Sequence, residues 1–315
     1  MNYDVYKMKK VEDSSTLQRK VDSFISFYSQ EDRSMNALAK LHLKNTDLDN
    51  VMLLHFEDED VASLKNISQI YGLNISQVRI KKDLSTNLID CLKQIDAYIK
   101  DKNSIGIDIS CMPIPYFAQI LRFLYKRYEK KTITVYYTEP SHYNLNKLFD
   151  FSAYEGEIDI KVIPGYEGKS SQINETQRIV FYLMGFEVSY MNKLIPQEIN
   201  PDSIAPINGF PSYFPKYKDI SLVNNNGNFF EKDIDLTYTE ANNPFETFNQ
   251  MLLLSAKNST YCIDIIPVGT KPMALGACLF ALKNGNTDCR MIFPFPTEYN
   301  TQQSSGNGTV WEYAI

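Results

Sequence analysis

The sequence lacks the short motifs that mark the common cofactor and hydrolase sites. The P-loop pattern GxxxxGK(S/T), the dinucleotide pattern GxGxxG and the nucleophile pattern GxSxG are all absent. The chain has only three histidines, and they are dispersed. Its five cysteines show no CxxC or Cys/His metal spacing (Cys91, Cys111, Cys262, Cys278 and Cys289). We therefore expect no cofactor, no metal site and no Ser-His-Asp hydrolase, and we interpret the cysteines as small buried side chains in a reducing compartment.

Long apolar runs are also missing. No stretch approaches the length of a membrane span, and the first residues contain no apolar signal core. Lys and Arg number 32 against 38 Asp and Glu, and the resulting net charge of −6 argues against direct nucleic-acid binding through a broad basic surface. With 43% apolar residues, the chain is typical of a globular protein. We expect a cytoplasmic protein with no membrane partner.

Short apolar runs alternate with stretches of helical periodicity along the whole chain. In the first half, the pattern predicts strands at Asp22–Tyr28, Asn50–Phe56, Gln77–Ile80, Ser104–Ile109 and Thr132–Tyr137. In the second half, it predicts strands at Ile158–Ile163, Arg178–Met184, Ser203–Ile207, Tyr261–Ile266 and Cys289–Pro294. The strands are apolar on both faces, and helices are expected between them. This pattern predicts an α/β fold with parallel sheets covered by helices, in the doubly wound, Rossmann-like arrangement.

The two halves of the chain match each other at a shift of 156 residues. The matches keep one register without gaps and cluster at predicted strand ends, for example Ile107-Asp-Ile109 with Ile263-Asp-Ile265. We interpret them as an internal duplication that gives two tandem Rossmann-like units related by a pseudo-two-fold axis. The predicted first unit is residues 1–156 and the second 157–315, with a loop insertion at about 208–228 and a polar C-terminal tail that ends in docking apolar residues.

The strongest chemical candidate is Gly269-Thr270-Lys271, between a predicted strand and a helix that begins near Pro272. Pro272 suits a first helical turn, where its missing N–H costs nothing. The free N–H groups of the helix start, the Thr270 hydroxyl, the Lys271 ammonium and the positive end of the helix dipole would together bind an anion. The segment is therefore a candidate phosphate site. The alternative is a plain strand–helix turn with an exposed lysine.

Carboxylates mark the other candidate positions. The repeat matches Asp108 with Asp264, near the strand ends where ligands of open α/β sheets bind. Either these side chains orient a ligand, or they accept hydrogen bonds from N–H groups of the following turn. The repeat also matches Glu31 with Glu187, which could form a pair of general acid/base groups. The alternative for this pair is ordinary acidic charge at a helix N-terminus.

The segment Asp264-Ile-Ile-Pro-Val-Gly-Thr-Lys-Pro-Met-Ala274 resembles the sensor domains with a CRISPR-associated Rossmann fold, known as CARF. Those domains carry an Asp-hydroxyl-Gly-Gly-Thr-Lys-like loop before a small-residue helix, and Asp108-Ile-Ser110 looks like a degenerate copy of that loop. Pro267 and Val268 stand where the family has a hydroxyl residue and a glycine. The resemblance implies a Rossmann-like unit used as a dimer, with a cyclic oligoadenylate or related nucleotide messenger at the two-fold axis. It also implies that some members cleave this ligand without a metal.

The leading hypothesis is a protein that binds a nucleotide or other phosphate-containing ligand between its two units, as a sensor in antiviral defence that acts on a separate effector protein. Thr270 and Lys271 would hold the phosphate, Ser110 and Asp264 would position the ligand, and the matched glutamates would line the cleft. Two alternatives stay open: a metal-independent phosphodiesterase or other hydrolase with the same residues, and a non-enzymatic interaction module with Asn208–Asn228 as its contact surface. The sequence does not decide whether the chain is an enzyme.

Overall fold

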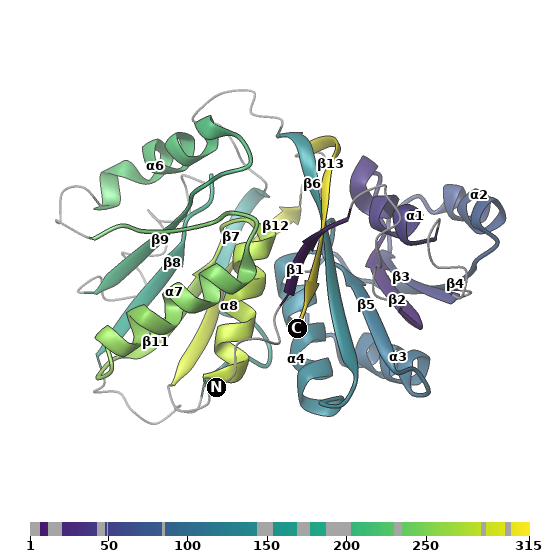
Figure 1. Cartoon of the computed structure of the whole chain (residues 1–315), viewed down its shortest axis with the longest axis horizontal. Coiled ribbons are helices and arrows are strands. Elements are labelled where there is room, and N and C mark those ends of the chain that lie inside the picture. The colour runs from purple at the N-terminus through teal and green to yellow at the C-terminus, as the bar shows by residue number, and fades with distance from the viewer. Residues whose placement is uncertain are drawn as a thin grey trace. The chain divides into compact units, whose positions relative to one another are not determined.

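The computed structural model describes residues 7–11, 21–42, 48, 50–83, 86–143, 154–168, 177–186, 203–229, 235–284, 288–299 and 304–315. The chain forms two compact α/β units. Unit 1 comprises Met1–Asn144 together with Thr301–Ile315, and unit 2 comprises Leu145–Asn300 (Figure 1). No helix within the described ranges is long and apolar enough to cross a membrane.

Unit 1 is built on a seven-stranded sheet in the order β1-β13-β6-β5-β2-β3-β4. Its strands are β1 (Lys7–Lys10), β2 (Ser23–Phe27), β3 (Asn50–Phe56), β4 (Asn74–Ile80), β5 (Ser104–Asp108), β6 (Thr132–Tyr143) and β13 (Ser304–Ala314). The strands from β6 to β4 pair in parallel, whereas β13 pairs antiparallel with both β6 and β1. The helical segments are η2 (Asp32–Met35), α1 (Asn36–His42), α2 (Ala62–Tyr71), α3 (Ile89–Ile99) and α4 (Ile114–Arg127).

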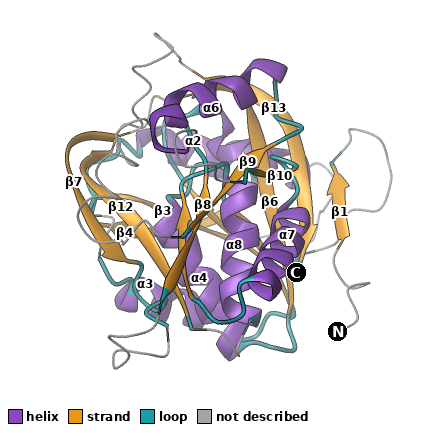
Figure 2. Cartoon of the chain, turned by 90° about the vertical axis from the view of Figure 1, so that its left-hand side faces the viewer, coloured by secondary structure: helices purple, strands orange, loops and turns teal. Residues whose placement is uncertain are grey.

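Unit 2 is built on a six-stranded sheet in the order β10-β9-β8-β11-β12-β7. Its strands are β7 (Tyr154–Val162), β8 (Arg178–Leu183), β9 (Ile204–Gly209), β10 (Thr237–Thr239), β11 (Cys262–Pro267) and β12 (Cys289–Tyr299). All neighbours pair in parallel except β7, which runs antiparallel to β12. The helices are α6 (Pro215–Phe229), α7 (Pro244–Lys257) and α8 (Lys271–Lys283), of which α7 and α8 lie side by side (Figure 2).

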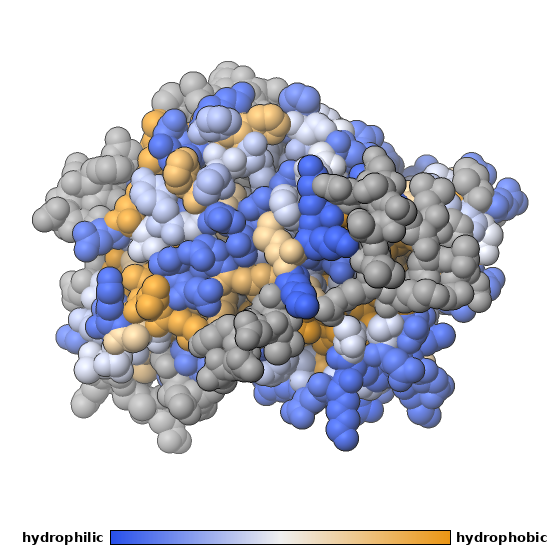
Figure 3. Space-filling model, viewed as in Figure 1, coloured by the Kyte–Doolittle hydropathy of each residue, from blue (hydrophilic) through white to orange (hydrophobic). Residues whose placement is uncertain are grey.

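The central strands are buried on both faces, as a parallel sheet covered by helices requires. Every residue of β2 and of β11 is buried. In unit 1, the rings of Phe27 and Phe56 pack edge to face at 5.0 Å between centroids; in unit 2, Phe181 of β8 meets Phe280 of α8 at 6.1 Å. Outside this core, apolar residues interrupt the hydrophilic surface of unit 2 (Figure 3), and Leu253 of α7 is 58% exposed. The predicted α/β class with two Rossmann-like units is confirmed.

Local signals in the sequence start helices α7 and α8 of unit 2. Before α7, the side chain of Asn243 accepts hydrogen bonds from the N–H groups of Phe245 and Glu246. Before α8, the Thr270 hydroxyl accepts one from the N–H of Met273. Each capping residue is followed by a proline within the first helical turn, where a missing N–H costs nothing. The predicted helix start near Pro272 is therefore confirmed.

The antiparallel strands β7 and β13 are exchanged between the two halves of the chain. Strand β7 follows β6 in sequence but pairs with β12, and β13 follows β12 but pairs with β6. The predicted boundary after residue 156 therefore falls inside β7, and the tail that we assigned to the second unit forms β13 of unit 1, between β1 and β6. The start of this strand, Ser-Ser-Gly-Asn-Gly, has little intrinsic strand preference, so pairing with β6 supplies its order.

Both sheets otherwise have the same strand order, which is what an internal duplication predicts. However, residues matched by the ungapped shift of 156 do not occupy equivalent positions in the strand pairing of the two sheets. Asp108 is the last residue of β5 and lies opposite Tyr136, whose match by the shift is Ile292. Asp264 is instead the third residue of β11 and lies opposite Arg290. The two aspartates are therefore not at equivalent positions, and the duplication stays an interpretation.

The predicted loop insertion at about 208–228 is wrong over most of its length, because it contains α6. This helix shows no clear apolar stripe in its sequence, Pro215–Phe229, and it includes three consecutive asparagines. Contacts with the rest of unit 2 stabilise this helix instead. Tyr217 and Ile220 are buried, and Ser221, Asn224 and Asn225 donate hydrogen bonds to backbone carbonyls of Gly185 and Phe186.

All five cysteines are free and buried, which confirms that they are small buried side chains. Burial raises the pKa of the Cys91 thiol to about 12 and that of Cys278 to about 12. Because the thiolate is the reactive form, we expect iodoacetamide at pH 8 to leave the native protein unmodified and to alkylate it rapidly in denaturant. Mass spectrometry after timed quenching measures this difference. Fast native labelling of Cys91 or Cys278 would contradict the buried environment.

The packing of α7 on α8 depends on Gly276. A Cβ atom at this position would lie 2.3 Å from the carbonyl oxygen of Pro244 and 2.8 Å from Cβ of Thr247. Helix propensity alone favours Ala over Gly by about 1 kcal/mol. We nevertheless expect Gly276→Ala to lower the free energy of unfolding by about 1–3 kcal/mol, because the two helices must separate. Urea denaturation measures it. The exposed control Ala256→Gly should lose about 1 kcal/mol from propensity alone, and a stabilised Gly276→Ala would contradict the contact.

Candidate functional site

Each sheet contains one point where the order of strands reverses. In unit 1, the chain passes from β2 outward to β3 and β4, and then returns to the other side of β2 as β5 and β6. In unit 2, the same reversal lies between β8 and β11 (Figure 1). Ligands of open α/β sheets bind beyond the carboxyl ends of the strands at such a switch point. The two candidate regions are therefore the loops after β2 and β5 in unit 1, and after β8 and β11 in unit 2.

The switch point of unit 1 is filled by a buried arginine. Arg33 is 7% exposed, and its Nε donates to Oε2 of Glu31 at 3.0 Å. Its Nη1 donates to the carbonyl oxygen of Thr138 on β6 at 3.3 Å. Burial acts to lower the pKa of Arg33, but the charges of Cys111 and Glu31 around it act in the other direction, and its pKa is raised well above the usual value. Arg33 is a permanent cation held by its ion pair.

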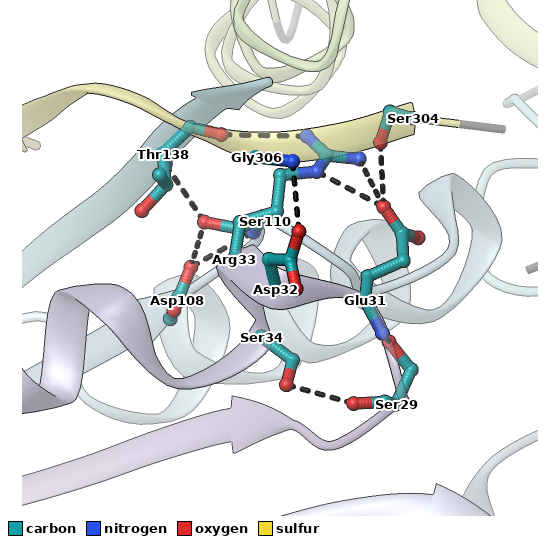
Figure 4. Close-up of polar contacts among 10 residues, drawn as sticks. All are labelled: Ser29, Glu31, Asp32, Arg33, Ser34, Asp108, Ser110, Thr138, Ser304 and Gly306. Carbon is teal, nitrogen blue, oxygen red and sulfur yellow. Dashed lines mark hydrogen bonds and ion pairs between the residues drawn. The ribbon is translucent and has the colours of Figure 1, made fainter. Parts of the chain in front are cut away.

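The loop that carries Glu31 is bound to the C-terminal strand β13. The Ser304 hydroxyl donates to Oε2 of Glu31 at 2.7 Å, and the N–H of Gly306 donates to Oδ2 of Asp32 at 2.9 Å (Figure 4). The side chain of Glu31 is only 9% exposed. Glu31 is thus committed to Arg33 and Ser304 within unit 1. Its predicted counterpart, Glu187, lies outside the described residues.

Asp108 and Ser110 lie in the same network, at the carboxyl end of β5 (Figure 4). The N–H of Ser110 donates to Oδ1 of Asp108 at 2.8 Å, and the Ser110 hydroxyl donates to the same oxygen. The N–H of Thr138 in turn donates to that hydroxyl at 2.7 Å. Both side chains are buried. Asp108 thus accepts hydrogen bonds within the turn that follows it, which is the second of the two roles that the sequence left open. Through Ser110, these contacts also connect the loop after β5 to β6.

Asp264 lies away from the candidate phosphate segment. It is the third residue of β11, and its carboxylate is 1% exposed. Arg178, which begins β8, donates to both carboxylate oxygens from Nε, and Arg290 on β12 donates from Nε and Nη2 at 2.8 Å. Burial acts to lower the pKa of Arg178, but the hydrogen bonds and charge of Asp264 outweigh it, and the pKa is raised. Asp264 therefore bridges two arginines near the amino ends of the strands, and Asp288 pairs with Arg178 as well, at 3.5 Å.

Gly269, Thr270 and Lys271 lie at the switch point of unit 2, between the end of β11 and the first turn of α8. The backbones of the two crossing loops touch here, because a Cβ atom on Gly185 would lie 2.1 Å from the carbonyl oxygen of Val268. A Cβ atom on Gly269 would lie 3.3 Å from the carbonyl oxygen of Met184. The glycines thus allow a close approach of chain to chain at the point where a ligand of this fold would lie.

The Thr270 hydroxyl is used inside the protein. It accepts from the N–H of Met273 at 3.3 Å and donates to the carbonyl oxygen of Ala241 in the loop before α7. Pro272 has no N–H, so the first turn of α8 offers fewer backbone donors than we expected. The structure therefore assigns Thr270 to helix capping. The helix dipole and the Lys271 ammonium are the parts of the predicted anion site that this capping leaves in place.

Three residues that the sequence interpretation missed lie at the same edge of unit 2. Asn224 donates from Nδ2 to the carbonyl oxygen of Phe186 at 2.6 Å, and Asn225 donates to that of Gly185 at 3.2 Å. Asn224 is 5% exposed, and its Oδ1 atom has no hydrogen-bond donor within the described part of the chain. Tyr182 donates to Oδ1 of Asn225 at 3.1 Å. The asparagine run was the signal in the sequence, but without helical periodicity it indicated a loop.

A buried histidine was also missed, in unit 1. His55 at the end of β3 is 1% exposed, its Nδ1 lies 2.7 Å from the carbonyl oxygen of Phe56, and its Nε2 has no partner among the described residues. Burial and the charge of Asp58 raise the pKa of Glu59. No group of three or more His, Cys, Asp or Glu side chains in the described ranges could hold a metal ion.

Comparison with known proteins gives no family. No protein-family model matches the chain, and no curated protein matches it. Among solved structures, a functionally unknown protein from Pseudomonas aeruginosa PAO1 is similar at 11% identity and a TM-score of 0.28, covering 87% of this chain and 93% of that one. The cytoplasmic domain of a prokaryotic cation chloride cotransporter is similar at 11% identity and a TM-score of 0.30, with coverages of 90% and 99%.

A universal stress protein from Archaeoglobus fulgidus DSM 4304 is similar at 11% identity and a TM-score of 0.25, covering 86% of this chain and 95% of that one. TM-scores of this size carry no conclusion about function. The fold assignment stands on the strand order and pairing of the two sheets.

The double arginine contact of Asp264 gives a sharp test of its role. We expect Asp264→Asn to lower the free energy of unfolding by about 1.5–3 kcal/mol, because it weakens the charge-assisted hydrogen bonds of two partly buried guanidinium groups, of which Arg178 keeps an ion pair with Asp288 at 3.5 Å. Urea denaturation measures this change. Asp90→Asn is the matched control: its carboxylate is 89% exposed, and its bond to Lys93 should contribute less than about 1 kcal/mol. Equal denaturation midpoints for the two variants would contradict the structural role.

Proposed function

We propose that this chain binds a nucleotide or other phosphate-containing ligand on unit 2, beyond the carboxyl ends of β8 and β11. The supporting observation is the coincidence of Gly269-Thr270-Lys271 with the topological switch point of the sheet. The start of α8 directs its positive dipole end to this place, and Lys271 adds a full positive charge. The backbones of Gly185 and Val268 touch here, so the ligand would lie beyond this contact, over the start of α8.

The proposal assigns no ligand to the switch point of unit 1. Its switch point holds the buried Arg33, and the groups that a ligand would need are bonded to one another: Glu31 with Arg33, and Ser110 with Asp108. A ligand there would have to break a buried ion pair, which costs about 3–5 kcal/mol when one partner is left uncompensated. The proposal therefore places one ligand on each chain, and it gives Asp108, Ser110 and Glu31 a supporting role.

The ligand class follows from the resemblance to CARF domains and from the absence of dinucleotide motifs. A cyclic oligoadenylate or a related nucleotide messenger supplies the phosphate that a lysine and a helix N-terminus favour. The protein would then act as a sensor in antiviral defence that passes the signal to a separate effector protein. The hydrolase alternative uses the same residues, so it is separated by chemistry. Incubation with the bound ligand should leave it intact, and product formation would identify a phosphodiesterase.

Ligand binding is tested by thermal unfolding against a panel of phosphate, mononucleotides and cyclic oligonucleotides. A ligand present at 100 times its dissociation constant should stabilise the native state by about 2.7 kcal/mol. We expect Lys271→Ala to abolish this shift and Lys257→Ala, an exposed lysine at the end of α7, to retain it. No shift with any ligand of the panel would reject the proposal. An equal shift in both variants would place the ligand elsewhere.

A further inference from the structure

Unit 2 exposes a group of aromatic rings at the carboxyl edge of its sheet, which we call the Phe210 patch: Phe210, Phe214 and Tyr238. Phe210 is 50% exposed, Tyr238 41% and Phe214 39%. Elsewhere in the described ranges, Tyr125 is the one aromatic residue among the exposed large apolar side chains. Burying even one such ring stabilises a protein by about 1.5–3 kcal/mol, so three exposed rings in one place call for an explanation by function.

The rings of the Phe210 patch are held in place by the fold. The N–H of Phe210 donates to the carbonyl oxygen of Thr239 at 2.6 Å, and its ring packs edge to face on Tyr238 at 6.0 Å between centroids. Phe214 packs in the same way on the buried Tyr217 at 5.1 Å. Rings that are already ordered lose little conformational entropy when a planar group stacks on them. The patch is therefore preorganised for binding.

The Phe210 patch also carries positive charge. Nζ of Lys218 on α6 lies 5.3 Å from the centroid of the Phe210 ring, and it also forms an ion pair with the exposed Asp219 at 3.2 Å. Lys216, close by on the same helix, lies 5.9 Å from the ring of Tyr217. A surface that combines open aromatic rings with ammonium groups suits an aromatic ligand that is also an anion. A purely apolar partner would instead have to desolvate these ammonium groups, at a cost in free energy.

One residue joins this patch to the proposed phosphate site. The carbonyl oxygen of Ala241 accepts from the Thr270 hydroxyl and from the Tyr213 hydroxyl, and its N–H donates to the carbonyl oxygen of Pro211. Phe210 and Tyr213 belong to the loop after β9. The side chain of Met273 packs against both Gly209, at the end of β9, and Gly269, before α8. The patch and the start of α8 are thus parts of one continuous edge.

From these contacts we propose that the Phe210 patch is a base-stacking subsite, so that unit 2 selects phosphate ligands that carry a nucleobase. This inference rests on the proposed function, because it assigns the second half of the same ligand. Lys271 and the start of α8 bind the phosphate, and the rings of Phe210 and Tyr238 bind the base. Stacking tolerates any base, so the subsite discriminates nucleotides from sugar phosphates more strongly than one base from another.

The test compares two probes that differ only in the base: adenosine monophosphate and ribose 5-phosphate, each titrated by calorimetry. We expect adenosine monophosphate to bind roughly 5- to 150-fold more tightly, which is the ratio that about 1–3 kcal/mol of stacking gives. Phe210→Ala and Tyr238→Ala should each lower the affinity for adenosine monophosphate and leave that for ribose 5-phosphate within about twofold. Tyr125→Ala, an exposed aromatic residue on α4, is the matched control and should change neither.

The outcomes separate this inference from the proposed function. Equal binding of the two probes by the wild-type chain would overturn the base subsite and leave the phosphate site standing. Binding of neither probe would reject both. Lys271→Ala should weaken both probes, whereas the aromatic variants weaken one. Size-exclusion chromatography without ligand tests whether the patch is instead a protein interface. Self-association of the wild type that Phe210→Ala abolishes would show such an interface and overturn the subsite. Unchanged thermal midpoints of the variants show that they are folded.

Discussion

Parallel pairing of the two central strands, β2 with β5 in unit 1 and β8 with β11 in unit 2, is the constraint on which the remaining structure depends. Parallel neighbours cannot be joined by a tight turn, so the chain must cross a face of the sheet between them. Because these crossings are right-handed, strands added on opposite sides of the first strand send their helices to opposite faces. The loops after the two central strands therefore part from each other at the carboxyl edge. Both candidate regions lie there for this topological reason.

The two units fill this edge with different chemistry. Unit 1 places a buried guanidinium between its loops, and a buried charge must keep its counter-charge and its hydrogen bonds. Arg33 therefore binds Glu31, and the C-terminal strand β13 completes the network through Ser304. Unit 2 places glycines at the same point, and its backbones touch directly. A polar network that is satisfied internally favours rigidity, whereas an edge with a helix N-terminus, a lysine and exposed rings favours a ligand.

Most of the fold was predictable from the sequence, since the apolar runs that form β2, β3, β5, β8 and β11 are long enough to be recognised one at a time. The exchanged strands were not, because a strand such as β13 is ordered by the backbone of β6 and by Trp311 donating to Glu139, far away in the sequence. Helix α6 was missed for a related reason. Its asparagines bond to carbonyls of the loop after β8, and such a contact leaves no periodicity in the sequence.

The sequence by itself determined the α/β class, the position of the strand–helix junction at Thr270, and the buried state of the cysteines, because each depends on neighbouring residues and on local hydrophobic pattern. The tertiary structure alone decided the roles of the carboxylates. Asp108 and Asp264 look equivalent in the sequence, yet one caps a turn at the carboxyl end of β5 and the other accepts hydrogen bonds from both Arg178 and Arg290. The reason is physical: the role of a charged side chain is set by which charges the fold brings within a few ångströms of it, and pairing between strands sets that.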